Sequence, residues 1–207
     1  MRIVCLDLEG VLVPEIWIAF ADATGIPAFR RTTRDEPDYD KLMRFRIDLL
    51  NRQGLKLADL QRVIGGIQPL EGAEDFTQSL REQCQLIILS DTYQEFAQPL
   101  MAKLNYPTLF CNRLVTDPAG NITGYRLRQK DGKNLAVQAL QSLNLQVFAA
   151  GDSFNDLAMI RSADAGCLFR APPGIREACP DLFCAETYSE LLQEITDFLQ
   201  RANFHES

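Results

Sequence analysis

The sequence predicts an α/β fold: a doubly wound parallel sheet with a small helical cap inserted after the first strand. Short apolar runs alternate with longer helical patterns, which is typical of a parallel sheet wrapped by helices. The stretch between Gly10 and Cys84 is far longer than one crossover connection requires. The chain has 207 residues, 46% of them hydrophobic, which suits one core domain with a small insert.

The predicted strands and helices of the core follow one another along the chain. Strands are expected at residues 3–7, 85–90, 108–111, 146–150 and 165–169, with a weaker candidate at 182–184. Helices are expected near residues 72–83, 93–104, 133–143, 154–162 and 187–202. Residues 113–117 and 122–127 flank a Pro-, Gly- and Asn-containing turn and are expected to form a β-hairpin appended to the sheet.

The long segment after the first strand has helical patterns near residues 15–24, 37–52 and 56–64. An insert at this point would lie over the carboxyl ends of the strands, where open α/β sheets bind their ligands. We therefore expect a Rossmann-like catalytic core made of residues 1–12 and 75–207, and a helical cap domain made of residues 13–74.

Composition argues against several classes of function. The net charge is −7 and the pI about 4.8, without a Lys/Arg cluster, so neither nucleic acid nor an anionic membrane is an expected partner. The six cysteines form no CxxC pair, which favours free thiols of a cytoplasmic protein. No apolar run reaches membrane-spanning length, and Asp7 and Glu9 interrupt any signal-peptide core. The single histidine, His205, lies in a polar tail, so histidine-based catalysis is not expected.

The first predicted strand ends at two carboxylates, Asp7 and Glu9, spaced two residues apart. Alternate side chains of an extended chain point the same way, so this pair is expected to project together while Leu8 faces the core. Two neighbouring carboxylates repel each other unless a cation lies between them or one of them holds a proton. Either condition indicates catalysis rather than a scaffolding role.

Two further apolar runs end in similar polar residues. Residues 86–89 precede Ser90, Asp91 and Thr92, and residues 147–150 precede a Gly-Asp-Ser-Phe-Asn-Asp segment that contains Asp152 and Asn155. The carboxyl ends of parallel strands share one edge of a sheet, so these side chains are expected to meet those that follow the first strand.

Lys133 is the lysine expected to join them. It lies in the first turn of a predicted helix for which Asp131 is the expected N-cap. A cation at that position opposes the helix dipole, which indicates a nearby anion. A solvated lysine is the alternative reading, and Lys130 is the reserve candidate.

This set of side chains suits metal-assisted phosphoryl transfer. Mg²⁺ prefers one or two carboxylates together with water, and Asp7 and Asp152 can supply them. Asp7 can attack phosphorus to form an aspartyl-phosphate, while Glu9 protonates the leaving alkoxide and then deprotonates the incoming water. Ser90 and a lysine can bind the equatorial oxygens as charge redistributes.

Four segments, in order, resemble the motifs of the haloacid dehalogenase superfamily of phosphatases. They are Asp7 to Val11, Ser90 after an apolar run, Lys133 at a helix start, and the segment from Gly151 to Asp156. Residues 13–17, 37–40, 89–92 and 127–131 resemble the bifunctional phosphoserine phosphatase/homoserine phosphotransferases of that superfamily, as does Glu9 in place of the usual second Asp. The resemblance implies Mg²⁺ at a site of Asp7, Glu9 and Asp152, phosphoserine as substrate, homoserine as a second acceptor, and a place in serine and threonine biosynthesis.

The predicted cap helix independently indicates an amino-acid substrate. Arg46 lies in an apolar stripe formed by the neighbours at offsets of three and four, Leu42, Met43, Leu49 and Leu50. An arginine in such a place needs a carboxylate or phosphate partner. The resemblance aligns Arg46 with the arginine that binds the substrate carboxylate, and Glu15 with the acid that receives the ammonium. The alternatives are an internal salt bridge for Arg46 and a helix-dipole role for Glu15.

The remaining residues of the motifs have smaller expected roles. Asp91, Thr92 and Asn155 join Ser90 in the expected substrate-binding set, and Asp156 is expected to support the Asp152 loop rather than bind metal. Ordinary phosphoserine phosphatases have Ser or Thr at the position of Gly10 and glycines at the positions of Asp91 and Thr92. Both departures are expected to reshape the pocket.

Three other functions compete with this prediction. A phosphatase for another small metabolite, such as a keto-sugar phosphate, leaves Glu15 and Arg46 together without an explanation. A phospho-accepting signalling receiver needs an exposed changing surface, which a long helical cap would cover. A catalytically inactive scaffold would not need every reactive group. The sequence leaves open the ratio of hydrolysis to transfer and whether the chain forms a homo-oligomer.

Overall fold

The computed structural model describes residues 1–33, 35–36 and 38–201, so His205 and the expected helix start at residue 37 lie outside the described residues. Seven strands form one sheet in the order β4-β3-β2-β1-β5-β6-β7. The strands are β1 (Arg2–Leu6), β2 (Gln85–Tyr93), β3 (Thr108–Thr116), β4 (Ile122–Arg126), β5 (Gln146–Gly151), β6 (Ala165–Phe169) and β7 (Cys184–Ala185). Neighbouring strands pair in parallel except β4, which is antiparallel to β3.

Nine α-helices and two 3₁₀ turns occur within the described residues. The α-helices are α1 (Ile16–Thr24), α2 (Tyr39–Arg52), α3 (Leu57–Gly66), α4 (Ala73–Gln83), α5 (Gln94–Lys103), α6 (Gly132–Ser142), α7 (Leu157–Ser162), α8 (Pro173–Ala178) and α9 (Tyr188–Gln200). The 3₁₀ turns are η1 (Pro27–Arg30) and η2 (Phe154–Asp156). None of these helices is long and apolar enough to cross a membrane.

The predicted α/β class is confirmed, and most elements lie where the apolar patterns place them. The expected break between residues 111 and 113 is wrong, because β3 runs through the buried Asn112. The side chain of Asn112 bonds the Asp91 carbonyl and the Arg128 amide, which satisfies this polar group inside the fold. The expected helix at residues 154–162 divides into η2 and α7, and the short α8 was not expected.

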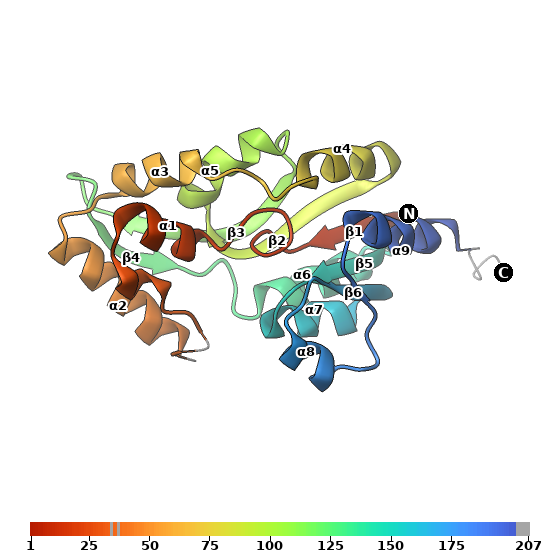
Figure 1. Cartoon of the computed structure of the whole chain (residues 1–207). Coiled ribbons are helices and arrows are strands. Elements are labelled where there is room, and N and C mark those ends of the chain that lie inside the picture. The colour runs from red at the N-terminus through yellow and green to blue at the C-terminus, as the bar shows by residue number, and fades with distance from the viewer. Residues whose placement is uncertain (34, 37, 202–207) are drawn as a thin grey trace.

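Two hydrophobic cores lie on opposite faces of the sheet. In β1, Val4 and Leu6 point into the core covered by α4, α5 and α9, whereas Ile3 and Cys5 point into the core covered by α6 and α7. Such a strand is apolar on both faces, which explains why the sequence shows a continuous run there rather than an alternation. Figure 1 shows the helices on both sides of the sheet.

The helices between β1 and α4 gather at one end of the molecule, beside β4 and α5 (Figure 1). Aromatic contacts join them to the rest of the fold: the Trp17 ring lies 5.5 Å from that of Phe96 on α5 and 5.9 Å from that of Phe29. Helix α4 packs instead against β2 and α9. The division into a core of residues 1–12 and 75–207 and a cap of residues 13–74 stays a prediction.

Candidate active site

Three adjacent strands deliver the predicted site residues to one edge of the sheet. Asp7 follows β1, Ser90 lies near the end of β2, and Asp152 follows β5. Strand β2 pairs with one side of β1 and β5 pairs with the other, so the strand order reverses direction at β1. Doubly wound sheets bind ligands at the carboxyl ends of the strands where this reversal occurs. The Asp7 amide donates to the Ala150 carbonyl at 3.0 Å, which extends the ladder to the first carboxylate.

Gly10 is required by the close approach of Asp152. A Cβ atom on Gly10 would lie 2.4 Å from the Asp152 Oδ2 atom, and the backbone has φ = +76°, which L side chains rarely adopt. This contact gives a physical reason for glycine at a position where Ser or Thr is usual. The turn after β1 thereby brings Asp7 close to Asp152 in the loop after β5.

Lys133 lies in the centre of the site. Its Nζ atom is 2.9 Å from the Asp7 Oδ1 atom, 2.6 Å from the Asp156 Oδ1 atom and 3.9 Å from the Asp91 Oδ2 atom. Burial alone would lower the pKa of Lys133, but the Asp156 and Asp7 carboxylates hold it well above its ordinary value. Lys130, the reserve candidate, is exposed.

The turn that carries this lysine differs from the expected one. Asp131 has φ = +53° and no side-chain bond to the backbone of α6; its carboxylate accepts from the Asn134 side chain at 2.7 Å. Asp131 is the N-cap residue of α6, as expected, but its side chain does not cap the helix. Lys133 reaches the carboxylates from the start of α6 without that cap.

Asp156 has a larger part in the site than the sequence indicated. It is fully buried, and its carboxylate accepts from the Ser153 amide at 3.0 Å and from the Ser153 hydroxyl at 2.8 Å, besides its ion pair with Lys133. The Ser-x-x-Asp spacing of a capping box, residues 153 to 156, is the sequence signal that could have indicated this orientation.

Three carboxylates form a group suited to a hard divalent cation. Asp7, Asp152 and Asp156 each offer an oxygen, and these atoms lie within 4.8 Å of one another. Burial and then repulsion by Asp156 raise the pKa of Asp7 well above its ordinary value, although Lys133 acts in the opposite direction. The same two causes raise the pKa of Asp152 to about 7. One lysine does not balance three acids, so the donor set fits Mg²⁺, which binds carboxylates and water.

Glu9 lies outside that group of three carboxylates and has its own partners. Its Oε2 atom accepts from the Ile16 amide at 2.8 Å. Burial raises the pKa of Glu9 to about 7, with a further contribution from Glu15 that the Ile16 amide and Arg46 oppose. A carboxyl group with such a pKa can hold a proton near neutrality and release it.

Arg46 is buried on α2 without an ion-pair partner among the described residues. Its guanidinium carbon lies 4.5 Å from the centre of the Trp17 ring, one nitrogen donates to the Arg31 carbonyl at 2.8 Å, and its Nε atom has no hydrogen-bond partner. Burial lowers its pKa, and the acids that oppose this include Glu9 and Glu15. The alternative of an internal salt bridge is therefore not found in the described part of the chain.

The last residues of β2 include several predicted substrate-binding residues. The Ser90 hydroxyl accepts from the Thr92 amide at 3.2 Å, and both residues are buried. The Asn155 amide donates to the Asp91 carboxylate at 2.9 Å, which joins the end of β2 to the loop after β5. Beyond it, the Tyr39 and Tyr93 hydroxyls lie 2.7 Å apart and connect α2 to the end of β2, a contact that the sequence did not indicate.

Comparison with known proteins identifies the family. The model of the haloacid dehalogenase-like hydrolases matches residues 1–164. The chain belongs to this family. A phosphoserine phosphatase from Pseudomonas syringae pv. tomato is 53% identical over 203 residues, 98% of this hydrolase and 84% of the relative. The phosphoserine phosphatase ThrH from Pseudomonas aeruginosa is 54% identical over 194 residues, 94% of this hydrolase and 95% of the relative.

Solved structures share the fold of this haloacid dehalogenase-like hydrolase. A phosphoserine phosphatase in its apo form has a TM-score of 0.75 at 21% identity, covering 93% of this chain and 98% of that one. A phospho-aspartyl intermediate analogue of phosphoserine phosphatase also has a TM-score of 0.75, at 20% identity, covering 93% and 97%. The predicted superfamily is confirmed, and at these identities the structural likeness concerns the fold alone.

The packing of Gly151 against Asp156 gives the first prediction. A Cβ atom on Gly151 would lie 2.3 Å from the Asp156 Cγ atom, whereas one on Gly65, in α3, meets nothing within 4 Å. Gly151→Ala should lower the free energy of unfolding by about 1–3 kcal/mol and reduce turnover, because Asp156 must move. Gly65→Ala should raise stability by about 0.5–1 kcal/mol and leave turnover unchanged. Urea unfolding and phosphate release measure both variants; equal behaviour of the two would contradict this packing.

Proposed function

We propose that this hydrolase removes phosphate from O-phosphoserine through an aspartyl-phosphate on Asp7. The observation that carries the proposal is Arg46: a buried guanidinium without a carboxylate partner among the described residues, close enough to Glu9 to affect its pKa. A phosphate ester that also bears a carboxylate would satisfy both the catalytic acids and this arginine. The names of the two bacterial relatives support the same substrate.

In the first step, a carboxylate oxygen of Asp7 attacks phosphorus, and the bond between phosphorus and the serine oxygen breaks. Glu9 gives its proton to the departing alkoxide, for which a pKa of about 7 is suited. Lys133 holds the Asp7 carboxylate in place at 2.9 Å and lowers the free energy of negative charge on the transferring group. The Ser90 hydroxyl, buried at the same edge, can bind another phosphoryl oxygen.

In the second step, Glu9 removes a proton from water, and the resulting oxygen attacks the phosphorus of phospho-Asp7, which regenerates the Asp7 carboxylate and releases phosphate. The carboxylates of Asp7, Asp152 and Asp156 are the residues that would hold Mg²⁺, which, when bound, neutralises charge on the phosphoryl oxygens. Asn155, through its hydrogen bond to Asp91, would hold the loop after β5 in place while serine leaves and water enters.

Recognition of the amino-acid part falls to the residues around Arg46. We assign the substrate carboxylate to Arg46 and the ammonium to Glu15, which is exposed and electrostatically coupled to Glu9. Trp17 keeps the guanidinium in place through its ring face, so little side-chain freedom is lost on binding. Thr92, whose buried amide donates to the Ser90 hydroxyl, would keep that hydroxyl oriented.

Homoserine is the proposed second acceptor. It carries the same ammonium and carboxylate as serine, so Glu15 and Arg46 can hold it once serine has left. Its hydroxyl can then take the place of water beside Glu9, and a bound acceptor has a high effective concentration in a closed site. The choice of homoserine rests on the resemblance of the sequence motifs described above.

Asp7→Asn should lower turnover at least about a thousandfold, because the amide cannot act as the nucleophile. The matched control is Asp48→Asn, which changes an exposed acid of α2 and should keep wild-type turnover. Phosphate release from phosphoserine and far-UV circular dichroism measure activity and folding of both. Turnover of a folded Asp7→Asn variant near the wild-type rate would remove Asp7 from the mechanism.

Chelation should abolish phosphate release, and Mg²⁺ should restore it, because the three clustered carboxylates repel one another without a cation. The Asp152→Asn variant should need a higher Mg²⁺ concentration for half-maximal activity. Activity is followed during a Mg²⁺ titration of chelator-treated protein. Full activity in exhaustively chelated protein would show that no divalent cation is needed.

Arg46→Ala should reduce kcat/KM for phosphoserine by about 10- to 150-fold, which corresponds to about 1.5–3 kcal/mol for a charge-assisted contact. p-Nitrophenyl phosphate lacks a carboxylate, so its kcat/KM should change little. Arg46→Lys should recover part of the loss, since a lysine keeps the charge but not the planar fork. An equal loss on both substrates would indicate that Arg46 serves packing of α2 rather than recognition.

Transfer is tested with phosphoserine as donor and isotopically labelled homoserine as acceptor. Labelled phosphohomoserine should accumulate, and the yield of free phosphate per serine released should fall as homoserine rises. Arg46→Ala should reduce transfer more than hydrolysis, because water needs no guanidinium. Continued phosphate release without labelled product at saturating homoserine would restrict the enzyme to hydrolysis.

A further inference from the structure

A cavity of about 550 Å³ lies on the open side of β3, next to the active site. β4 pairs with β3 only from Arg113 onward, so within the described residues the first part of β3 has no strand on that side. Side chains of α5, the loop after it, β3 and the end of β4 line the cavity. Its volume is in the range of sites that bind small molecules.

The charge of this cavity is unusual for the molecule. Three arginines line it, Arg113, Arg126 and Arg128, and no acid is among its described lining residues, although the whole chain has a net charge of −7. None of the three forms an ion pair with a described residue. A concave surface with one sign of charge attracts ligands of the other sign.

Two of these arginines oppose each other. Arg113 and Arg126 are directly paired in the antiparallel β3–β4 ladder, and both are exposed. Like charges in directly opposite positions destabilise a strand pair. An anion placed between two guanidinium groups turns that repulsion into two charge-assisted contacts.

The remaining lining is largely apolar. Phe110 and Leu127 line the cavity, and Tyr106 at its margin is 69% exposed. The Arg128 guanidinium carbon lies 5.2 Å from the centre of the Phe110 ring, so this arginine is already held on an aromatic face. Apolar walls beside fixed cations favour a ligand that has both an apolar body and a negative group.

We propose that this cavity is a second binding site, separate from the catalytic one, for a small organic anion in which a phosphate, sulfonate or carboxylate is attached to an apolar ring or chain. A second copy of the chain is a poor occupant, because a twofold interface would join two copies of the same patch, each with three arginines and no acid among its described lining residues. The cavity is linked to the active site through Asn112, whose side chain bonds the Arg128 amide and the Asp91 carbonyl, each at 2.9 Å.

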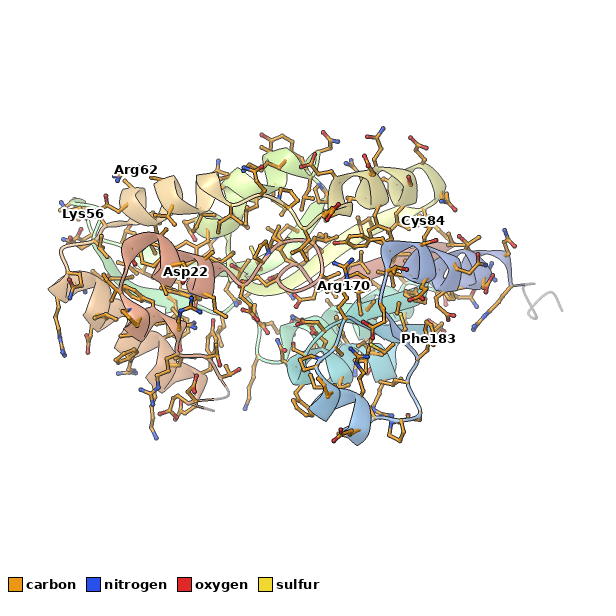
Figure 2. All side chains as sticks on the ribbon, viewed as in Figure 1. Asp22, Lys56, Arg62, Cys84, Arg170 and Phe183 are labelled. Carbon is orange, nitrogen blue, oxygen red and sulfur yellow. The ribbon has the colours of Figure 1, made fainter. Side chains whose placement is uncertain are left out.

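The probe for this site is 8-anilino-1-naphthalenesulfonate, an apolar aromatic anion whose fluorescence rises in an apolar environment. Titration of the native full-length protein should give saturable binding to one site. Arg113→Glu and Arg126→Glu should each weaken binding at least tenfold. Arg62→Glu is the matched control: Arg62 lies on α3 (Figure 2) and is not among the residues that line the cavity, and the substitution makes the same change in net charge. The affinity of this variant should equal that of the wild type.

Stability gives a second readout that separates a ligand site from a purely structural role. Arg126→Glu places an acid opposite Arg113, so the ligand-free variant should have a higher urea midpoint than the wild type by circular dichroism. The probe should raise the midpoint of the wild type but not that of the variant. If Arg113→Glu and Arg126→Glu both bound the probe with wild-type affinity, the proposal would be overturned. So would sedimentation showing a wild-type dimer that Arg126→Glu dissociates, since the face would then be an interface between copies.

Discussion

The buried contact of one ammonium group with two carboxylates is the constraint on which the rest of the site depends. Lys133, Asp7 and Asp156 come from three different segments and are all nearly inaccessible to water. Each charge would be costly to bury alone, and a buried network tolerates little displacement of its members. The start of α6, the end of β1 and the turn after β5 are therefore fixed relative to one another before any substrate is present.

This constraint explains why small residues stand beside the acids. Gly10 and Gly151 allow Asp152 and Asp156 to approach the neighbouring backbone more closely than any Cβ atom would permit. The close approach brings three carboxylate oxygens into one region, where burial first and then their mutual repulsion raise the pKa values of Asp7 and Asp152; a cation can relieve that repulsion. Positioning for catalysis is thus obtained from backbone geometry rather than from mobile side chains.

Most of the candidate site could be predicted from the sequence, because its residues lie at the ends of predicted strands. Asp7, Ser90 and Asp152 come directly after apolar runs, and parallel topology then places them at one edge. The Ser-x-x-Asp spacing indicates a capping box at Asp156, but the ion pair of Asp156 with Lys133 could not be predicted, since it depends on how the η2 turn directs a side chain five residues beyond the end of β5. Asn112 was missed for a related reason: a polar residue within an apolar run resembles a break unless its buried partners are known. Asp131 shows the reverse error, because a favourable residue type does not guarantee capping geometry.

The hydroxyl pair between Tyr39 and Tyr93 connects α2 to the end of β2, the strand that carries Ser90 and Asp91. It is a bond between neutral groups, and burial raises the pKa of both phenols above their ordinary values, so neither ionises near neutrality. Dissolved salt weakens attraction between exposed charges but has little effect on such a bond. The contact between α2 and the end of β2 should therefore be the same in dilute and in concentrated electrolyte, whereas the proposed binding of a charged substrate should depend on ionic strength.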